Sequence, residues 1–127
     1  MAKIYDLYKD GRMQATLKAS AGGGGVLSIQ NDSDKPIFVE DLCVRITTPV
    51  AGQTFDAGIA ANGTTSAENL IDGGSLAAAA RLSNSLNPGT NGRSRAIWLP
   101  GQFLTITASG TPTGLAGTVD IYGKEIN

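Results

Sequence analysis

Few residues in this chain are of a type that carries catalysis. The 127 residues include no histidine and a single cysteine, Cys43. Without histidine, neither a Ser–His nor a Cys–His dyad can form. One cysteine excludes an intrachain disulfide and a cysteine-based zinc site. We expect Cys43 to be a small buried apolar residue rather than a nucleophile.

Two pairs of carboxylates lie close together in the sequence, Asp32 with Asp34 and Glu40 with Asp41. The first pair falls in a turn cluster and lacks the further ligands and closing glutamate of a calcium loop. The second pair occupies adjacent positions of an expected strand, where neighbouring side chains point to opposite faces, so it is unsuited to flank a glycosidic bond. The sequence therefore favours a protein that is not an enzyme and holds no metal and no cofactor.

A hydroxyl cluster and a run of glycines are the next candidates for chemistry. The hydroxyls of residues 64–66 (TTS) have no nearby base except Glu68. Residues 22–25 are four consecutive glycines, which lack the spacing of a phosphate-binding loop and precede no strong helix. We interpret them as a flexible hairpin loop.

The basic and aromatic residues near position 95 are better suited to contacts between proteins. Arg93 and Arg95 form the one basic cluster, and Trp98 follows them. Two arginines of this kind are typical ion-pair partners across an interface. Trp98 is expected to pack in the core or anchor an interface, and the alternative is a platform that stacks on a sugar ring.

Composition narrows the class of protein further. A formal net charge of −1 offers no basic surface for nucleic acid or for an anionic membrane. No apolar run approaches the roughly 20 residues that span a bilayer, and the first residues lack the apolar stretch of an export signal. We expect a soluble protein, made in a reducing cytoplasm, with one domain.

The elements that must position these residues are strands. Glycine accounts for 17 of the 127 residues, which favours turns over long helices. Alternating apolar residues predict strands, most clearly at 26–30, 37–47, 96–99, 102–108 and 115–126. The alternation changes parity at Glu40–Asp41, which predicts a β-bulge or a strand that changes sheets. The predicted fold is all-β, an antiparallel β-sandwich or jelly roll of seven or eight strands.

The middle of the chain is expected to be a long irregular insertion, about residues 48–95. Within it, residues 65–73 can form one short helical turn, and residues 76–82 a second helix or a strand. Residues 83–94 (SNSLNPGTNGRS) form a long polar loop. Loops of that length are usually functional or bound to a partner.

The first twelve residues (MAKIYDLYKDGR) differ from the rest, because four large apolar side chains alternate with charged ones. These apolar residues are Ile4, Tyr5, Leu7 and Tyr8. Residues 1–12 can be a first strand of the core. Alternatively they are an N-terminal arm that buries these side chains against another chain, with residues 13–127 forming the β-sandwich domain.

Three segments together resemble a pattern in small structural proteins of tailed bacteriophages. They are residues 56–73 (DAGIAANGTTSAENLIDG), residues 89–95 (GTNGRSR) and the late tract 108–110 (ASG) with 114–122 (GLAGTVDIY). The likeness covers roughly residues 54–122 and is to capsid decoration (cement) proteins. It implies a small β-sandwich or jelly-roll subunit, often trimeric, that binds the major capsid protein on the outer shell. The protein would then be made in the host cytoplasm and reside in the virion.

This resemblance suggests how the candidate residues are used. The arm residues Ile4, Tyr5, Leu7 and Tyr8 would dock on the shell or on a neighbouring subunit. The long loop, with Asn91, Arg93 and Arg95, would lie at a subunit junction. The alternatives are a tail-fibre or baseplate β-module and a carbohydrate-binding module, and the latter would expose Trp98 together with a tyrosine.

Overall fold

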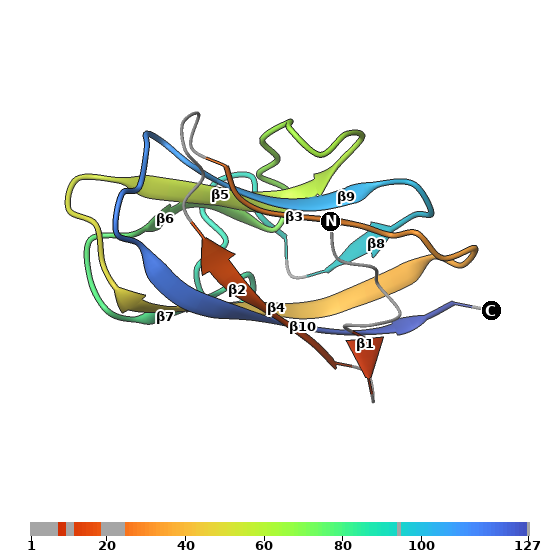
Figure 1. The fold of residues 1–127 in the computed structure, drawn as a ribbon. Helices are drawn as coiled ribbons and strands as arrows, with labels where there is room; N and C mark the ends of the chain where they lie inside the picture. The colour runs from red at the N-terminus through yellow and green to blue at the C-terminus, as the bar shows by residue number, and fades with distance from the viewer. Residues whose placement is uncertain (1–7, 10–11, 19–24, 94, 127) are drawn as a thin grey trace.

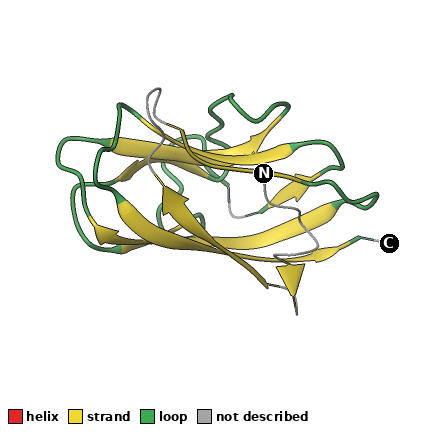
Figure 2. Cartoon of the chain, in the orientation of Figure 1, coloured by secondary structure: helices red, strands yellow, loops and turns green. Residues whose placement is uncertain are grey.

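The computed structural model describes residues 8–9, 12–18, 25–93 and 95–126, which form ten strands and no helix (Figure 1, Figure 2). The strands stack in two layers, as the all-β prediction requires. Their bounds are β1 (Tyr8–Lys9), β2 (Arg12–Lys18), β3 (Gly25–Gln30), β4 (Ile37–Thr48), β5 (Thr54–Ala60), β6 (Ile71–Ser75), β7 (Arg81–Ser83), β8 (Ala96–Trp98), β9 (Phe103–Ala108) and β10 (Ala116–Glu125).

Both sheets are antiparallel, and their strand orders show how the chain is wound. One sheet runs β1-β2-β10-β4-β7, with β8 also paired to β4, and the other runs β3-β9-β5-β6. Four pairs are nested in the sequence: β5 with β6, β4 with β7, β3 with β9 and β2 with β10. The chain therefore runs out through four strands and returns beside each of them, and the predicted β-sandwich is confirmed.

The long strand β4 contains the irregularity that the sequence predicts. Asp41 pairs with Tyr122 and Val39 with Gly123, so Glu40 is one extra residue on the β4 side. Leu42, Val44 and Ile46 after this point are buried, and so are Ile37 and Val39 before it. The bulge keeps both groups facing the core although their parity differs. The strand stays in one sheet, which decides between the two predicted alternatives.

Residues 48–95, expected to be a long irregular insertion, instead supply β5, β6 and β7. The expected helical turn at 65–73 and the possible helix at 76–82 are wrong, since residues 71–75 and 81–83 are strands. Small residues are used here because neighbours approach closely. A side chain at Gly58 would overlap Asn69, and one at Gly74 would overlap the ring of Phe55. The glycines therefore hide the alternation that marks a strand.

The short strand β8 is held in place by buried polar contacts. Trp98 is fully buried, and its indole Nε1 donates to the carbonyl oxygen of Gln102 at 2.9 Å. The side chain of Asn31, also fully buried, donates to the carbonyl oxygen of Trp98 at 2.9 Å. Because buried polar groups need partners, these bonds specify where β8 lies. Ile97, between the inward-facing positions, points out of the sheet and is 52% exposed.

Candidate functional site

The loop between β7 and β8, residues 84–95, is fastened to the edge of β6. Asp72 donates its backbone N–H to Pro88 at 2.9 Å, and Arg93 donates its own to the carbonyl oxygen of Asn69 at 3.1 Å. A side chain at Gly92 would overlap the carbonyl oxygens of Pro88 and Leu70, so only glycine permits this approach. The loop thus covers an edge that would otherwise be open for strand pairing.

Asn84 ties the start of this loop to the first sheet. Its buried side chain accepts from the backbone N–H of Leu42 at 2.9 Å and donates to the carbonyl oxygen of Arg93 at 3.0 Å. One side chain therefore connects β4 with the far end of the loop. The prediction of a loop at 83–94 is confirmed for the residues that the structure describes, although Ser83 still belongs to β7.

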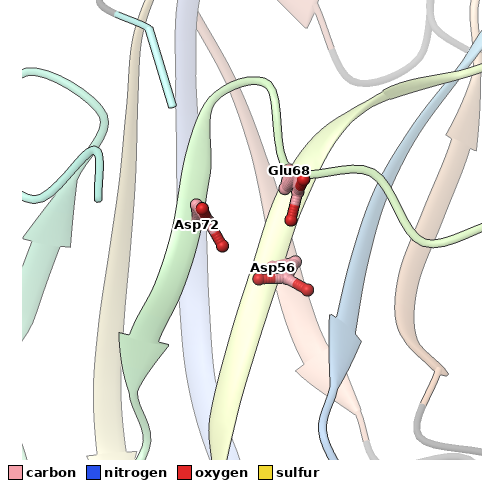
Figure 3. Close-up of side chains that lie close together, drawn as sticks. All are labelled: Asp56, Glu68 and Asp72. Atoms are coloured by element: carbon pink, nitrogen blue, oxygen red, sulfur yellow. The ribbon is translucent and has the colours of Figure 1, made fainter. Parts of the chain in front are cut away.

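Three carboxylates meet beside the loop, from β5, from the segment before β6 and from β6 itself (Figure 3). Oxygen atoms of Asp56, Glu68 and Asp72 all lie within 4.8 Å of one another. The neighbouring charge of Asp72 is the main cause that raises the pKa of Glu68 above its usual range. Carboxylate oxygens are the ligands that hard cations prefer, but exposed acidic groups of this kind also occur without a metal.

Asn91 binds this acidic cluster. Its backbone N–H donates to Asp72 at 3.1 Å, and its side-chain nitrogen donates to Asp72 at 2.8 Å and to Glu68 at 3.1 Å. The cluster therefore holds the loop through Asn91. The amide nitrogen of this residue, predicted to serve at a subunit junction, is engaged within the chain.

Arg93 and Arg95 lie on the other side of the loop, along an open cleft of about 530 Å³. Apart from the two arginines, the cleft is lined by four apolar and two polar residues, Phe38, Ile59, Ala96, Ile97, Asn69 and Gln102. The Arg95 guanidinium carbon is 6.0 Å from the ring centroid of Phe38, at the outer limit of a cation–π contact.

Neither arginine is neutralised within the described part of the chain. The one salt bridge between described residues joins Lys124 to Glu40 at 3.3 Å. Arg95 and Phe38 also line a smaller cleft of about 410 Å³, together with Glu40 and Lys124. Two guanidinium groups beside apolar walls match a carboxylate that is flanked by apolar side chains.

Large apolar side chains lie exposed around this loop and cleft. Leu86 is 83% exposed, Ile97 is 52% and Leu99 is 47%. Aromatic or aliphatic anchors next to arginine are the composition that favours protein–protein contacts. Trp98 is not one of them, because it is fully buried and cannot stack on a sugar. The interpretation of Trp98 as a core residue is confirmed.

The other residues singled out for chemistry are placed in structural roles. Cys43 is only partly buried and lies on the outer side of β4, so the expectation of a buried residue is wrong in part. Burial, and next the charge of Asp41, raise the pKa of its thiol, which makes the thiolate scarcer. Asp32 and Asp34 lie exposed in a turn, as predicted. Thr64 and Thr65 donate their hydroxyls to Asn62.

Of the four residues predicted to form the arm contact, the structure describes only Tyr8. Ile4, Tyr5 and Leu7 lie outside the described residues. Tyr8 belongs to β1, whose backbone pairs with β2 through Tyr8–Met13 and Lys9–Arg12. Arg12, placed at the end of the predicted arm, begins β2.

Sequence reasoning missed the partners of the predicted residues rather than the residues themselves. Phe38 and Ile59 come from β4 and β5, and no spacing in the sequence places either beside Arg95. Asp56 and Asp72 meet because β5 and β6 are neighbours. Local signals existed only for the loop, through its length and its two arginines.

Comparison of the chain with protein-family models, with curated proteins and with solved structures finds no match. In the described part of the chain, no helix has the length and the apolar character that crossing a membrane requires.

Proposed function

We propose that this protein is a structural component of a tailed-phage virion that binds the outer surface of the capsid and stabilises the shell. It would be made in the host cytoplasm, assemble as a homotrimer and contact the major capsid protein. It would carry out no reaction and need no cofactor, nucleic acid or membrane. The sequence resemblance supplies the class of protein, and two features of the structure support it.

The first supporting feature is the nested pairing of eight strands. Two four-stranded layers wound in this way, β2-β10-β4-β7 and β3-β9-β5-β6, are typical of a jelly roll. Viral capsid proteins are among the proteins that use jelly rolls, although lectin domains use them as well. Fold alone does not assign a function, so the argument depends on the surface.

The second feature, which carries the proposal, is the loop at residues 84–95. It is held by backbone hydrogen bonds and by the acidic cluster, yet it presents Arg93 and Arg95 without acidic partners in the described chain. Residues that are held by hydrogen bonds before binding lose little conformational entropy on binding, which favours association. Modest contacts of this kind gain avidity when a trimer repeats them on a symmetric shell.

Co-sedimentation with undecorated capsids tests the proposal. We expect wild-type protein to saturate the particles and to raise the temperature at which they lose integrity. The double variant Arg93→Ala/Arg95→Ala should bind less, whereas Arg81→Ala, an exposed arginine on β7, should bind normally. Wild-type protein that leaves the particles unoccupied at every concentration overturns the proposal.

A truncated protein tests whether the N-terminal arm contributes to capsid binding. Removing residues 1–7 leaves β1 and β2 in place, so the fold described above should persist. Reduced occupancy on capsids would support a role of Ile4, Tyr5 and Leu7 in docking. Unchanged occupancy would exclude that role.

The alternative locations give different results in the particle. A tail-fibre or baseplate module would place antibody-gold label on the tail, whereas the proposal requires it on the head. The carbohydrate-binding alternative loses its main support, because Trp98 is buried and not exposed beside a tyrosine.

A further inference from the structure

The cleft beside Arg95 presents positive charge that nothing described in the chain balances. Its guanidinium groups belong to Arg93 and Arg95, and the described residues that line it include no acidic side chain. Phe38 and Ile97 belong to its apolar lining, and Ile97 is 52% exposed. A partner that fits the cleft should therefore present carboxylates next to an exposed apolar side chain.

The acidic cluster on the opposite side of the same loop has the complementary charge. Oxygen atoms of Asp56, Glu68 and Asp72 lie within 4.8 Å of one another (Figure 3). Residues 46–80 contain these three acidic residues and no lysine or arginine, so the neighbouring sequence does not neutralise them. No salt bridge between described residues involves the cluster.

The repulsion within the cluster is not relieved by the groups that bind it. The side chain of Asn91 and the backbone N–H of Gly73 donate hydrogen bonds to it, and both are neutral. The charge of Asp72 is the main cause that raises the pKa of Glu68, whereas a nearby cation would lower that pKa. Each carboxylate has about four positions that accept hydrogen bonds, so the cluster can also bind a guanidinium group.

Leu86 supplies the exposed apolar side chain that a partner of the cleft requires. It is 83% exposed. It precedes Pro88 by two residues, and the carbonyl oxygen of Pro88 accepts from the backbone N–H of Asp72 at 2.9 Å. Because two extended residues span about 7 Å, Leu86 lies near the acidic cluster. Carboxylates and an apolar side chain therefore occur together on this side of the loop.

We propose that the cleft of one copy of the chain binds the acidic cluster of a second copy. Glu68 of the second copy faces Arg95, where a guanidinium group and a carboxylate can form paired hydrogen bonds. Leu86 of the second copy lies against Phe38 and Ile97. The inference rests on the oligomeric part of the proposed function and names the contact that builds the oligomer.

The position of the two surfaces argues for a contact between copies. The loop backbone lies against β6 between them, as the hydrogen bonds from Asp72 to Pro88 and from Arg93 to Asn69 show. Because the surfaces are on opposite sides of the loop, one copy can bind a neighbour through each, which is a heterologous contact. A heterologous contact closes into a ring when the rotation permits, and a trimer is one such ring.

Charge reversal in the full-length chain tests the contact. We expect Glu68→Arg alone and Arg95→Glu alone each to raise the dissociation constant of the oligomer about tenfold or more, measured by sedimentation equilibrium. The matched reversals Asp34→Arg and Arg81→Glu, at exposed positions outside the lining of the cleft and the acidic cluster, should leave that constant unchanged. Cooperative thermal unfolding, measured at dilutions where the chains are monomeric, shows that each variant is folded.

A variant of Leu86 tests the apolar part of the contact without changing any charge. Leu86→Ser should raise the same dissociation constant severalfold, because it removes an apolar anchor. Its high exposure means that the fold should not depend on it. Tyr122→Ser, at a 38% exposed position of β10, is the control and should leave association unchanged. Equal dissociation constants for Leu86→Ser and wild type overturn the proposed placement of Leu86.

The double variant Glu68→Arg/Arg95→Glu gives the decisive result. In every copy the reversed position of the cluster then meets the reversed position of the cleft in its neighbour. The dissociation constant of the double variant should therefore fall below that of either single variant. Residues that do not meet across the interface give losses that add, so a double variant weaker than both single variants overturns the proposal.

The remaining outcomes separate this inference from the proposed function. Wild-type protein that sediments as a monomer at every concentration overturns the contact between copies even if the protein binds capsids. An oligomer that responds to both reversals but leaves capsids unoccupied upholds the contact and overturns capsid decoration. If Arg95→Glu loses capsid binding while the oligomer stays intact, the cleft binds the shell and the inference is overturned.

Discussion

The two sides of the loop between β7 and β8 use polar groups in opposite ways. On one side, Asn91 is bound by Asp72 and Glu68, and the backbone lies against β6. On the other side, Arg93 and Arg95 line a cleft and meet no described carboxylate. The comparison teaches that one short segment can contain both the polar groups that hold it in place and the charged side chains that it leaves available for a partner.

The largest loss of stability is expected from a substitution where the backbone of the loop contacts β6. In Gly92→Ala the new methyl group would overlap two carbonyl oxygens, those of Pro88 and Leu70, so the loop must move away. We expect the free energy of unfolding to fall by about 3 kcal/mol in urea denaturation.

Gly52→Ala is the matched control for this clash. Gly52 has φ of 76° but nothing within 4 Å of the added carbon, so only the backbone strain remains. That strain costs about 1 kcal/mol. Equal losses in the two variants would show that contact between the loop and β6 contributes nothing.

The next effect concerns the link between the loop and β4. Asn84→Ala removes a buried side chain and leaves the N–H of Leu42 and the carbonyl of Arg93 without their partner. The cost of such unpaired groups predicts a loss of about 2 kcal/mol. Asn62→Ala, in an exposed turn, should cost less than about 1 kcal/mol. Faster hydrogen exchange at Leu42 in the Asn84 variant would localise the effect.

On the side of the loop that carries Arg93 and Arg95, we expect a substitution to weaken binding while leaving the stability of the fold almost unchanged. Arg95→Ala removes an exposed side chain with no salt bridge to a described residue, so the free energy of unfolding should change by less than about 0.5 kcal/mol. Binding to capsids or to other copies should nevertheless weaken. A loss of stability as large as that of Asn84→Ala would mean that Arg95 is an anchor as well.

The strands also differ in how well the sequence predicts them. Strands β4, β9 and β10 could be predicted, including the bulge at Glu40, because large apolar residues alternate along them. Strands β5 and β6 could not, because Gly58 and Gly74 replace apolar residues where Asn69 and Phe55 approach.

The site was predictable only where it is local. Arg93 and Arg95 are neighbours in the sequence, and their loop is long enough to be noticed. Phe38 and Ile59 reach the same cleft through pairing in two different sheets, which no pattern within a short window encodes. The acidic cluster depends in the same way on the pairing of β5 with β6.

The smallest expected change in stability comes from the repulsion between Glu68 and Asp72 in the acidic cluster. The raised pKa of Glu68 means that the folded state disfavours its ionised form, mainly because of Asp72. This penalty is present at neutral pH, decreases as the pH falls through the pKa of the folded state, and is gone below the usual carboxyl pKa of about 4.3. Glu68→Gln, which can still accept from Asn91, should therefore unfold at a slightly higher temperature than wild type at pH 7.

That difference in unfolding temperature should shrink as the pH is lowered and disappear once Glu68 is protonated in both states. Glu125→Gln, at the end of β10, removes the same charge away from the cluster and serves as the control. A lower unfolding temperature for Glu68→Gln at pH 7 would reverse the sign. The hydrogen bond from Asn91 to the ionised Glu68 carboxylate would then stabilise the fold by more than the repulsion from Asp72 destabilises it. The attachment of the loop would in that case depend on the charge of Glu68.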